Sequence, residues 1–366
     1  MTRAFVFAAT ILSMIALASG AGRAQLLAGR DQAELPIDAA MTTTVIDEAL
    51  KRLEENYVFP EVAAKMAAAV RQRMEGKEYA AIKTGQELAR LLTQHLQDVS
   101  KDKHLRVNYS TEKRRPPPAG REPTAEDKAR RRVMAEKANA AYRRVERLAG
   151  NVGYLELDAF MHENDAAGPA AAAMTFLART DALIIDLRRN GGGSPHGVAL
   201  LCSYFFDDKP VHLNSLYWRK GDRTDEFWTR TDLAGPRYVG KPVYVLTSSR
   251  TFSGAEEFTY NLQCLKRATI VGETTGGGAH PGGGFPINEH FMMFIPTGRA
   301  INPITKTNWE GVGVKPDVPA SADQALDVAH RAAVDKLIET TKDEEFKKQI
   351  RADLERDRAR TAAAKP

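Results

Sequence analysis

The chain has 366 residues, with 52 Lys and Arg against 47 Asp and Glu, a net charge of +5, 43% hydrophobic residues and two cysteines. That length is enough for one large or two ordinary domains with a hydrophobic core. The composition excludes collagen-like, wholly disordered and disulfide-framework proteins. A surplus of +5 over the whole chain is too dilute to indicate a nucleic-acid partner, and none is expected.

The first 24 residues are typical of a signal peptide. Thr2-Arg3 gives a short basic start, Ala4 to Ala18 is almost unbroken apolar sequence, and small residues lead up to Ala24. A membrane anchor is the alternative, but the apolar run is shorter than the roughly 20 residues that span a bilayer. We therefore expect cleavage near Ala24, export to the periplasm or out of the cell, and no transmembrane span in the mature chain. Loss of Arg3 and Arg23 lowers the net charge to +3.

Two segments precede the main body of the chain. Residues 30–105 predict a helical domain, because apolar side chains such as Val45, Ala49 and Leu53 recur every three to four residues. Residues 106–149 form a basic Pro/Arg-rich insertion, with twelve basic and six acidic residues between 111 and 147. We expect irregular structure around its prolines and a charged helix over 125–147. A solvated linker and surface helix is favoured over a membrane or nucleic-acid surface, and its role stays open.

Residues 150–320 predict a mixed α/β domain, in which buried strands alternate with helices. The expected strands are 152–157, 182–187, 243–247 and 268–271, and the expected helices are 166–179, 197–206 and 254–265. Residues 321–366 return to helix and end in a charged tail. Cys202 and Cys264 fall in two of the predicted helices. A disulfide and two reduced, packed thiols are equally consistent with their positions.

A glycine turn and a serine are the first candidates for chemistry. Gly191 to Gly193 follow a predicted strand, where backbone N–H groups can converge on an oxyanion; a simple tight turn is the alternative. Ser253 begins a predicted helix, where the positive end of the helix dipole favours charge developing on an adduct. The alternative is that this serine only caps the helix.

Several strings resemble the tail-specific (C-terminal-processing) serine peptidase family. They cover most of the mature chain in the family's order: residues 55–60, 102–104, 183–193, 251–256, 270–276 and 307–317. The resemblance implies a ClpP/crotonase-like ββα spiral as the catalytic domain. It also implies that Ser253 is the nucleophile and that Gly254 with Gly192 or Gly193 forms the oxyanion hole.

The chain departs from the best-known branch of that family. No PDZ-like strand pattern lies between His104 and Gly150, and the position of that branch's Lys general base is occupied by Gly278. The sequence looks more like the branch of the tricorn core protease and the repeats of interphotoreceptor retinoid-binding protein. This resemblance implies His104 as the general base and Glu310 as the carboxylate that orients it. The tricorn pattern has a serine immediately before the histidine, where this chain has Lys103.

Three further residues are candidates for the same site. His280, in the glycine-rich stretch after Gly278, is the second candidate for the base. His196, Gly278 and His280 are candidates for substrate contacts. No cofactor is expected, and no spacing of His, Cys, Asp and Glu indicates a metal site.

The sequence thus predicts an exported serine endopeptidase or C-terminal-processing-type peptidase acting on peptides or unfolded proteins. The alternatives are a non-catalytic protein that binds apolar ligands or acts as a scaffold, and an esterase or acyltransferase using the same oxyanion site. An oligomer is possible.

Overall fold

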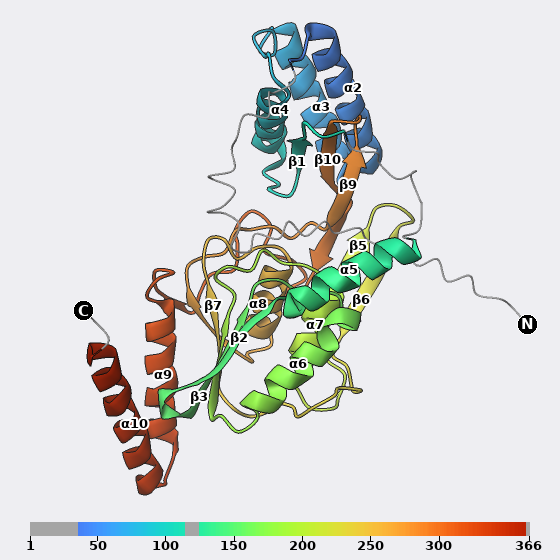
Figure 1. Ribbon diagram of the computed structural model, residues 1–366. Helices are drawn as coiled ribbons and strands as arrows, with labels where there is room; N and C mark the ends of the chain where they lie inside the picture. Colours follow the sequence, from blue (N-terminus) through green and yellow to red (C-terminus); the bar gives the residue numbers. More distant parts are fainter. Residues whose placement is uncertain (1–35, 114–123, 364–366) are drawn as a thin grey trace, which may run out of the picture. The chain divides into compact units, whose positions relative to one another are not determined.

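The computed structural model describes residues 36–113 and 124–363, which divide into two compact units (Figure 1). The predicted signal peptide and the stretch around Pro116 to Pro118 lie outside the described residues. Among the described residues, unit 1 consists of 36–113, 124–129, 216–224 and 280–300, and unit 2 consists of 130–215, 225–279 and 301–363. No helix among the described residues is both long and apolar enough to cross a membrane.

Unit 1 begins with three helices, α2 (Ala39–Asn56), α3 (Pro60–Glu75) and α4 (Gly85–Ser100). Side chains capping the first turn fix the starts of α2 and α4: Asp38 accepts the N–H of Met41, and Thr84 accepts the N–H of Glu87. The apolar residues that recur every three to four positions are buried against one another. The predicted helical leader is therefore formed by these three helices.

The same core is closed by a small antiparallel sheet of order β1-β10-β9. Its strands are β1 (Arg106–Tyr109), β9 (Gly282–Pro286) and β10 (Phe291–Pro296). Val107 pairs with Met293, and both are buried in the core of the three helices. Residues 282–296, from the last third of the sequence, thus complete the N-terminal unit.

Unit 2 is built on a six-stranded sheet of order β12-β8-β7-β4-β3-β2. All neighbouring strands are parallel except β2, which runs antiparallel to β3 at one edge. Every residue of β4 and β7 is buried, as expected for central parallel strands covered on both faces. The strands are β2 (Tyr142–Leu148), β3 (Val152–Leu157), β4 (Ala182–Asp186), β7 (Val243–Thr247), β8 (Thr269–Gly272) and β12 (Val318–Pro319).

Helices cover both faces of this sheet. Figure 1 shows α9 (Ala325–Thr340) and α10 (Glu344–Ala363) on one side, where Ala329 and Ala333 pack on Ile184 and Leu246. On the other side lie α6 (Glu163–Leu177), α7 (Pro195–Ser203) and α8 (Gly254–Cys264). This arrangement confirms the predicted mixed α/β class with a helical N-terminal region.

Strands of a third sheet carry the chain between the units. Its order is β11-β5-β6, and each strand begins in one unit and ends in the other. The strands are β5 (His212–Trp218), β6 (Arg223–Trp228) and β11 (Gly298–Ile301).

Two sequence expectations are decided by the structure. The charged helix predicted over 125–147 is wrong in its second half: α5 spans Ala125–Lys137, and residues 142–148 form β2. Positive φ angles at Asn139, Ala140 and Ala141 end the helical conformation. The polar segment that follows pairs with β3, which satisfies its backbone hydrogen-bonding groups. Of the two outcomes left open for the cysteines, Cys202 and Cys264 are both free thiols.

We predict that Gly197→Ala destabilises the protein by at least about 2 kcal/mol, measured by chemical denaturation. A Cβ at this position of α7 lies 2.0 Å from the carbonyl oxygen of Met161, a main-chain atom that cannot turn aside. Gly191→Ala is the matched control, because a Cβ there meets no heavy atom within 4 Å; its effect should stay within about 0.5 kcal/mol. Equal effects of the two substitutions contradict this packing argument.

Candidate active site

The candidate nucleophile lies where loops leave the carboxyl ends of the parallel strands. The loops after β4, β7 and β8 all emerge at this edge of the unit 2 sheet, the usual location of ligand sites in open α/β sheets. The loop after β4 carries Gly191 to Gly193, and the loop after β7 carries Ser253. The structure therefore brings the glycine turn and the serine together, as the sequence predicted.

Ser253 has a backbone conformation that is rare for a residue other than glycine. Its φ is 55° and its ψ is −123°, and α8 begins at the next residue. Such angles cost free energy and persist only where the surroundings impose them. A serine at a sharp turn from a strand into a helix is typical of an exposed nucleophile.

The Glu256 carboxylate imposes that conformation. Its Oε2 accepts the N–H groups of Ser253 and Gly278, both at 2.8 Å. Its Oε1 accepts the Thr275 hydroxyl at 2.5 Å and the Gly277 N–H at 2.6 Å. Burial raises the pKa of Glu256, while these four donors lower it. One side chain thus fixes the serine main chain and the loop after β8.

The glycine turn lies directly against Ser253. A Cβ on Gly192 would lie 2.8 Å from the Cβ of Ser253, and one on Gly254 would lie 3.0 Å from the Gly193 nitrogen. The Gly192 N–H donates to Asn190 Oδ1 at 2.8 Å. Of the two alternatives from the sequence, the Gly192 N–H is already bonded, so the N–H groups of Gly193 and Gly254 are the candidate pair of oxyanion donors.

Side chains of the loop after β7 tie it to the loop after β4. Ser248 Oγ donates to the carbonyl of Arg188 at 2.6 Å, and Thr251 Oγ1 donates to the carbonyl of Leu187 at 2.8 Å. The Phe252 N–H donates to the carbonyl of Asn190 at 3.1 Å. The turn and the serine are consequently held in register, as preorganised oxyanion donors require.

Glu310 lies beside the glycine-rich loop in unit 2. Its Oε2 accepts the N–H of Ala279 at 2.5 Å, and the neighbouring Trp309 donates from Nε1 to the carbonyl of Gly278 at 2.7 Å. The N–H of Gly311 donates to the carbonyl of Gly277. Residues 309–311 therefore fix residues 277–279, the segment that leads into His280.

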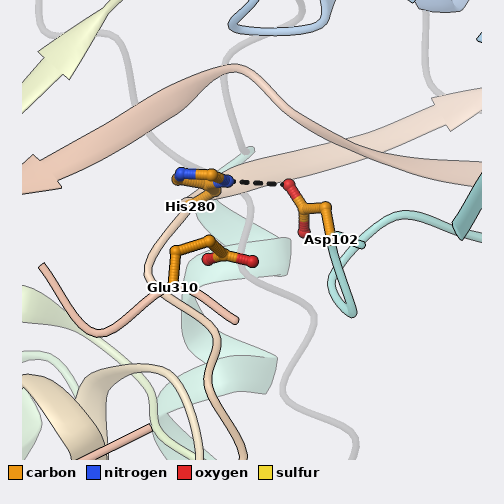
Figure 2. A group of neighbouring side chains, drawn as sticks. All are labelled: Asp102, His280 and Glu310. Carbon is orange, nitrogen blue, oxygen red and sulfur yellow. Dashed lines mark hydrogen bonds and ion pairs between the residues drawn. The ribbon is translucent and has the colours of Figure 1, made fainter. Parts of the chain in front are cut away.

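The two candidate bases both lie in unit 1, near one buried carboxylate. Figure 2 shows His280 Nδ1 bonded to Asp102 Oδ2, at 2.8 Å. The Tyr57 hydroxyl donates to the same oxygen at 3.1 Å, and the N–H of His104 donates to Asp102 Oδ1 at 3.0 Å. A carboxylate on Nδ1 leaves Nε2 of the neutral ring as its acceptor nitrogen.

The His104 imidazole is buried in an apolar setting. It stacks on the Phe294 ring with centroids 5.9 Å apart, and the Arg106 guanidinium contacts the same ring. Burial lowers the pKa of His104 to about 4, and Asp102 opposes this shift, while Arg106 and His280 add to it. The ring is therefore neutral at pH 7, the form able to accept a proton.

His196, a candidate for substrate contact, lies near the start of α7. Its ring is 5.1 Å from the His162 ring and 5.3 Å from the Phe227 ring, measured between centroids. Burial lowers its pKa. It is thus a neutral member of an aromatic cluster in unit 2.

Glu257 is buried one helical turn after Ser253. It has fewer hydrogen-bond donors around its carboxyl group than Glu256 has. Burial raises its pKa to about 7, an effect only partly offset by the Asn214 amide. Its Oε1 has no hydrogen-bond partner among the residues that the structure describes. Burial raises the pKa of the Cys202 thiol, and the nearby Glu257 adds to this effect.

Sequence reasoning missed two features of this region. The spacing Ser253-x-x-Glu256 is a capping-box signal and could have identified the glutamate that holds the serine. The pairing of Asp102 with His280 has no local signal, because 178 positions separate them.

Comparison with known proteins supports the family assignment. Residues 151–320 match the profile of peptidase family S41, and residues 38–146 match the N-terminal domain described for S41 peptidases in eukaryotic IRBP. Together these two matches cover most of the chain.

The chain belongs to peptidase family S41. It is 28% identical over 169 residues to the chloroplastic carboxyl-terminal-processing peptidase 2 of Arabidopsis thaliana, a match covering 46% of this chain. The chain spans about a third of the length of that relative, since the match covers 32% of it. As a member of S41, a serine peptidase family, it has the fold expected from the sequence.

Solved structures agree with the S41 fold. A candidate peptidase from Parabacteroides merdae matches with a TM-score of 0.54 and 18% identity, covering 80% of this chain and 96% of that one. A lipoprotein from Streptococcus agalactiae matches with a TM-score of 0.53 and 15% identity, covering 81% and 96%. At these identities the likeness concerns the fold.

We predict that Glu256→Gln destabilises this S41 chain by about 2–4 kcal/mol, measured by denaturation at pH 8. Glutamine keeps only one of the two acceptor oxygens. Its NH2 group replaces the other oxygen and faces donors that are then left without an acceptor. The effect should include loss of protection from hydrogen exchange at Gly277 and Gly278. A loss below 1 kcal/mol contradicts the role given to this carboxylate.

We predict the opposite for the adjacent Glu257→Gln. A carboxyl whose folded pKa is raised contributes stability that is fully present below its unfolded pKa of about 4.5 and is lost as the pH rises through about 7. The stability of the variant relative to wild type should therefore increase by about 3 kcal/mol from pH 4.5 to pH 8. Denaturation curves of both proteins over this range provide the test, and a constant difference refutes it.

Proposed function

We propose that this S41 member is a serine peptidase that hydrolyses peptide bonds through an acyl-enzyme on Ser253. The observation that carries the proposal is the placement of Ser253 at a strained turn beside the N–H groups of Gly193 and Gly254. Donors fixed before the reaction stabilise the negative charge of a tetrahedral intermediate.

The chemistry follows from those positions. Ser253 Oγ attacks the peptide carbonyl carbon while its proton passes to a histidine, and the carbonyl oxygen becomes the oxyanion between Gly193 and Gly254. The histidine returns the proton to the leaving amine, which breaks the C–N bond. Water then repeats these steps on the acyl-enzyme and releases the acid.

His104 is the histidine that the family resemblance assigns to this step, with Glu310 as the orienting carboxylate. The low pKa of His104 keeps it neutral at pH 7, as a proton acceptor must be. Gly278 replaces the lysine base of the better-known branch, and its N–H serves Glu256 instead. A histidine base is therefore the chemistry consistent with this loop.

The substrate class and cellular location are part of the same proposal. The curated relative is named as a carboxyl-terminal-processing peptidase, and peptides or unfolded proteins are accordingly the substrates proposed here. The apolar N-terminal segment, residues 4–18, supports export after cleavage near Ala24. His196 and Gly278 are proposed to line the substrate side of the site.

We predict that a fluorophosphonate probe labels the wild-type chain on Ser253, as peptide mapping by mass spectrometry would show. Ser253→Ala should lose labelling and lower peptide hydrolysis by at least about 10³-fold. Removing one member of a cooperating catalytic set costs about as much activity as removing the whole set. Its melting temperature should be unchanged or higher.

Ser249→Ala is the matched control, because Ser249 lies in the same loop but is exposed. It should label and hydrolyse like wild type. A folded wild-type protein that is not labelled contradicts the proposal and favours the non-catalytic binder. Hydrolysis of small esters without turnover of any peptide in a diverse library favours the esterase.

A further inference from the structure

Asp102 joins three segments of unit 1 through one buried carboxylate. Its side chain is 1% exposed, and it accepts hydrogen bonds from the Tyr57 hydroxyl, from His280 Nδ1 and from the His104 N–H. Tyr57 follows α2, His104 precedes β1, and His280 precedes β9. Figure 2 shows the bond from His280.

A local turn explains only one of these bonds. An aspartate commonly accepts the N–H two residues later, as Asp102 does from His104. The other two donors are 45 and 178 positions away in the chain. Removing a carboxylate from water is costly unless donors compensate it, so these distant donors are what allow Asp102 to remain buried.

The consequences of this arrangement converge on His104. The bond to its N–H fixes the main chain that carries the imidazole, and stacking on Phe294 fixes the ring. The negative charge of Asp102 favours the protonated form of His104, whereas positive charge on His280 or Arg106 disfavours it. Placement and basicity of His104 therefore both depend on the partner of Asp102.

His280 is held as a well-defined partner. Its ring packs edge-on against Phe59, with centroids 5.4 Å apart, in addition to its bond to Asp102. Tyr57 and His104 also donate to Asp102, and Arg106 contacts the Phe294 ring on which His104 stacks. Asp102 is therefore a negative charge shared by both imidazoles.

We propose that Asp102 and His280 form a positioning pair for His104, which sets the orientation and the basicity of that residue. The pair itself touches no reacting atom in this scheme. The inference rests on the proposed peptidase function and deepens it, because it explains how a histidine within an apolar pocket stays competent as a base. His280 lowers the pKa of His104, so the pair that places the imidazole also limits how readily it is protonated.

The pair is tested with two substitutions of His280 in the full chain. His280→Ala removes the donor to Asp102 and should lower kcat by about 10- to 100-fold, while KM changes by less than about threefold. His280→Asn places an amide N–H where Nδ1–H was, without an imidazole ring. It should recover kcat at pH 8 to within about threefold of wild type.

The pH profile separates positioning from a merely structural role. His280→Asn removes the side chain that lowers the pKa of His104, so the acid limb of kcat/KM should move to higher pH by about half a unit or more. His104→Ala should abolish turnover. The matched control is His95→Asn, which changes another buried histidine of unit 1, bonded to Tyr79 rather than to Asp102. It should change the melting temperature and leave the acid limb in place.

Three outcomes overturn the inference: wild-type kcat in His280→Ala, failure of His280→Asn to recover activity in a folded protein, or an unshifted acid limb in His280→Asn. Each is read against wild-type labelling of Ser253 by the fluorophosphonate probe. If wild type is not labelled, the proposed peptidase function has failed. If it is labelled and only the His280 results differ, the positioning pair alone is wrong.

Discussion

The geometry of the candidate site depends on a single buried carboxylate, Glu256. It lies in the first turn of α8, where the helix dipole favours negative charge, and it accepts four hydrogen bonds. One donor is the main-chain N–H of Ser253, and the other three come from the loop after β8. The hydrogen bond from the Ser253 N–H to Glu256 helps to hold the unfavourable backbone angles of Ser253. The same bond helps to compensate the burial of the Glu256 carboxylate.

The neighbouring Glu257 shows that burial alone does not decide what a carboxyl group does. Both residues are buried in the same turn of α8, yet Glu256 points its oxygens at convergent N–H and O–H groups, whereas Glu257 faces an amide and a thiol. The free energy of ionising each group is set by the number of donors that replace water. Glu257 is therefore expected to destabilise the fold at neutral pH, whereas the adjacent Glu256 fixes the loops around Ser253.

The sequence was sufficient for features encoded by local patterns. Parallel strands appeared as short apolar runs, the glycine turn as three consecutive glycines, and Ser253 as a polar residue at a helix start. The helix predicted over 125–147 failed because its charged residues fit a polar edge strand equally well, and only pairing with β3 decides between the two. The bond between Asp102 and His280 joins residues far apart in the chain, and no periodicity encodes such a contact.

Residues 277–280 connect these observations. Gly277 and Gly278 donate to Glu256, Ala279 donates to Glu310, and His280 donates to Asp102, so four consecutive residues compensate three carboxylates. A Cβ on Gly277 would lie 3.1 Å from main-chain atoms of Gly311 and Gly313, at a φ of +82° that favours glycine. At the position where the better-known branch of the family is expected to have a lysine, this loop has Gly278, whose N–H donates to Glu256. The same loop ends in the imidazole that holds Asp102, which in turn holds His104. Under the proposed mechanism, this loop thus contributes main-chain donors in place of a lysine, and it supplies the side chain that supports the proposed base, His104.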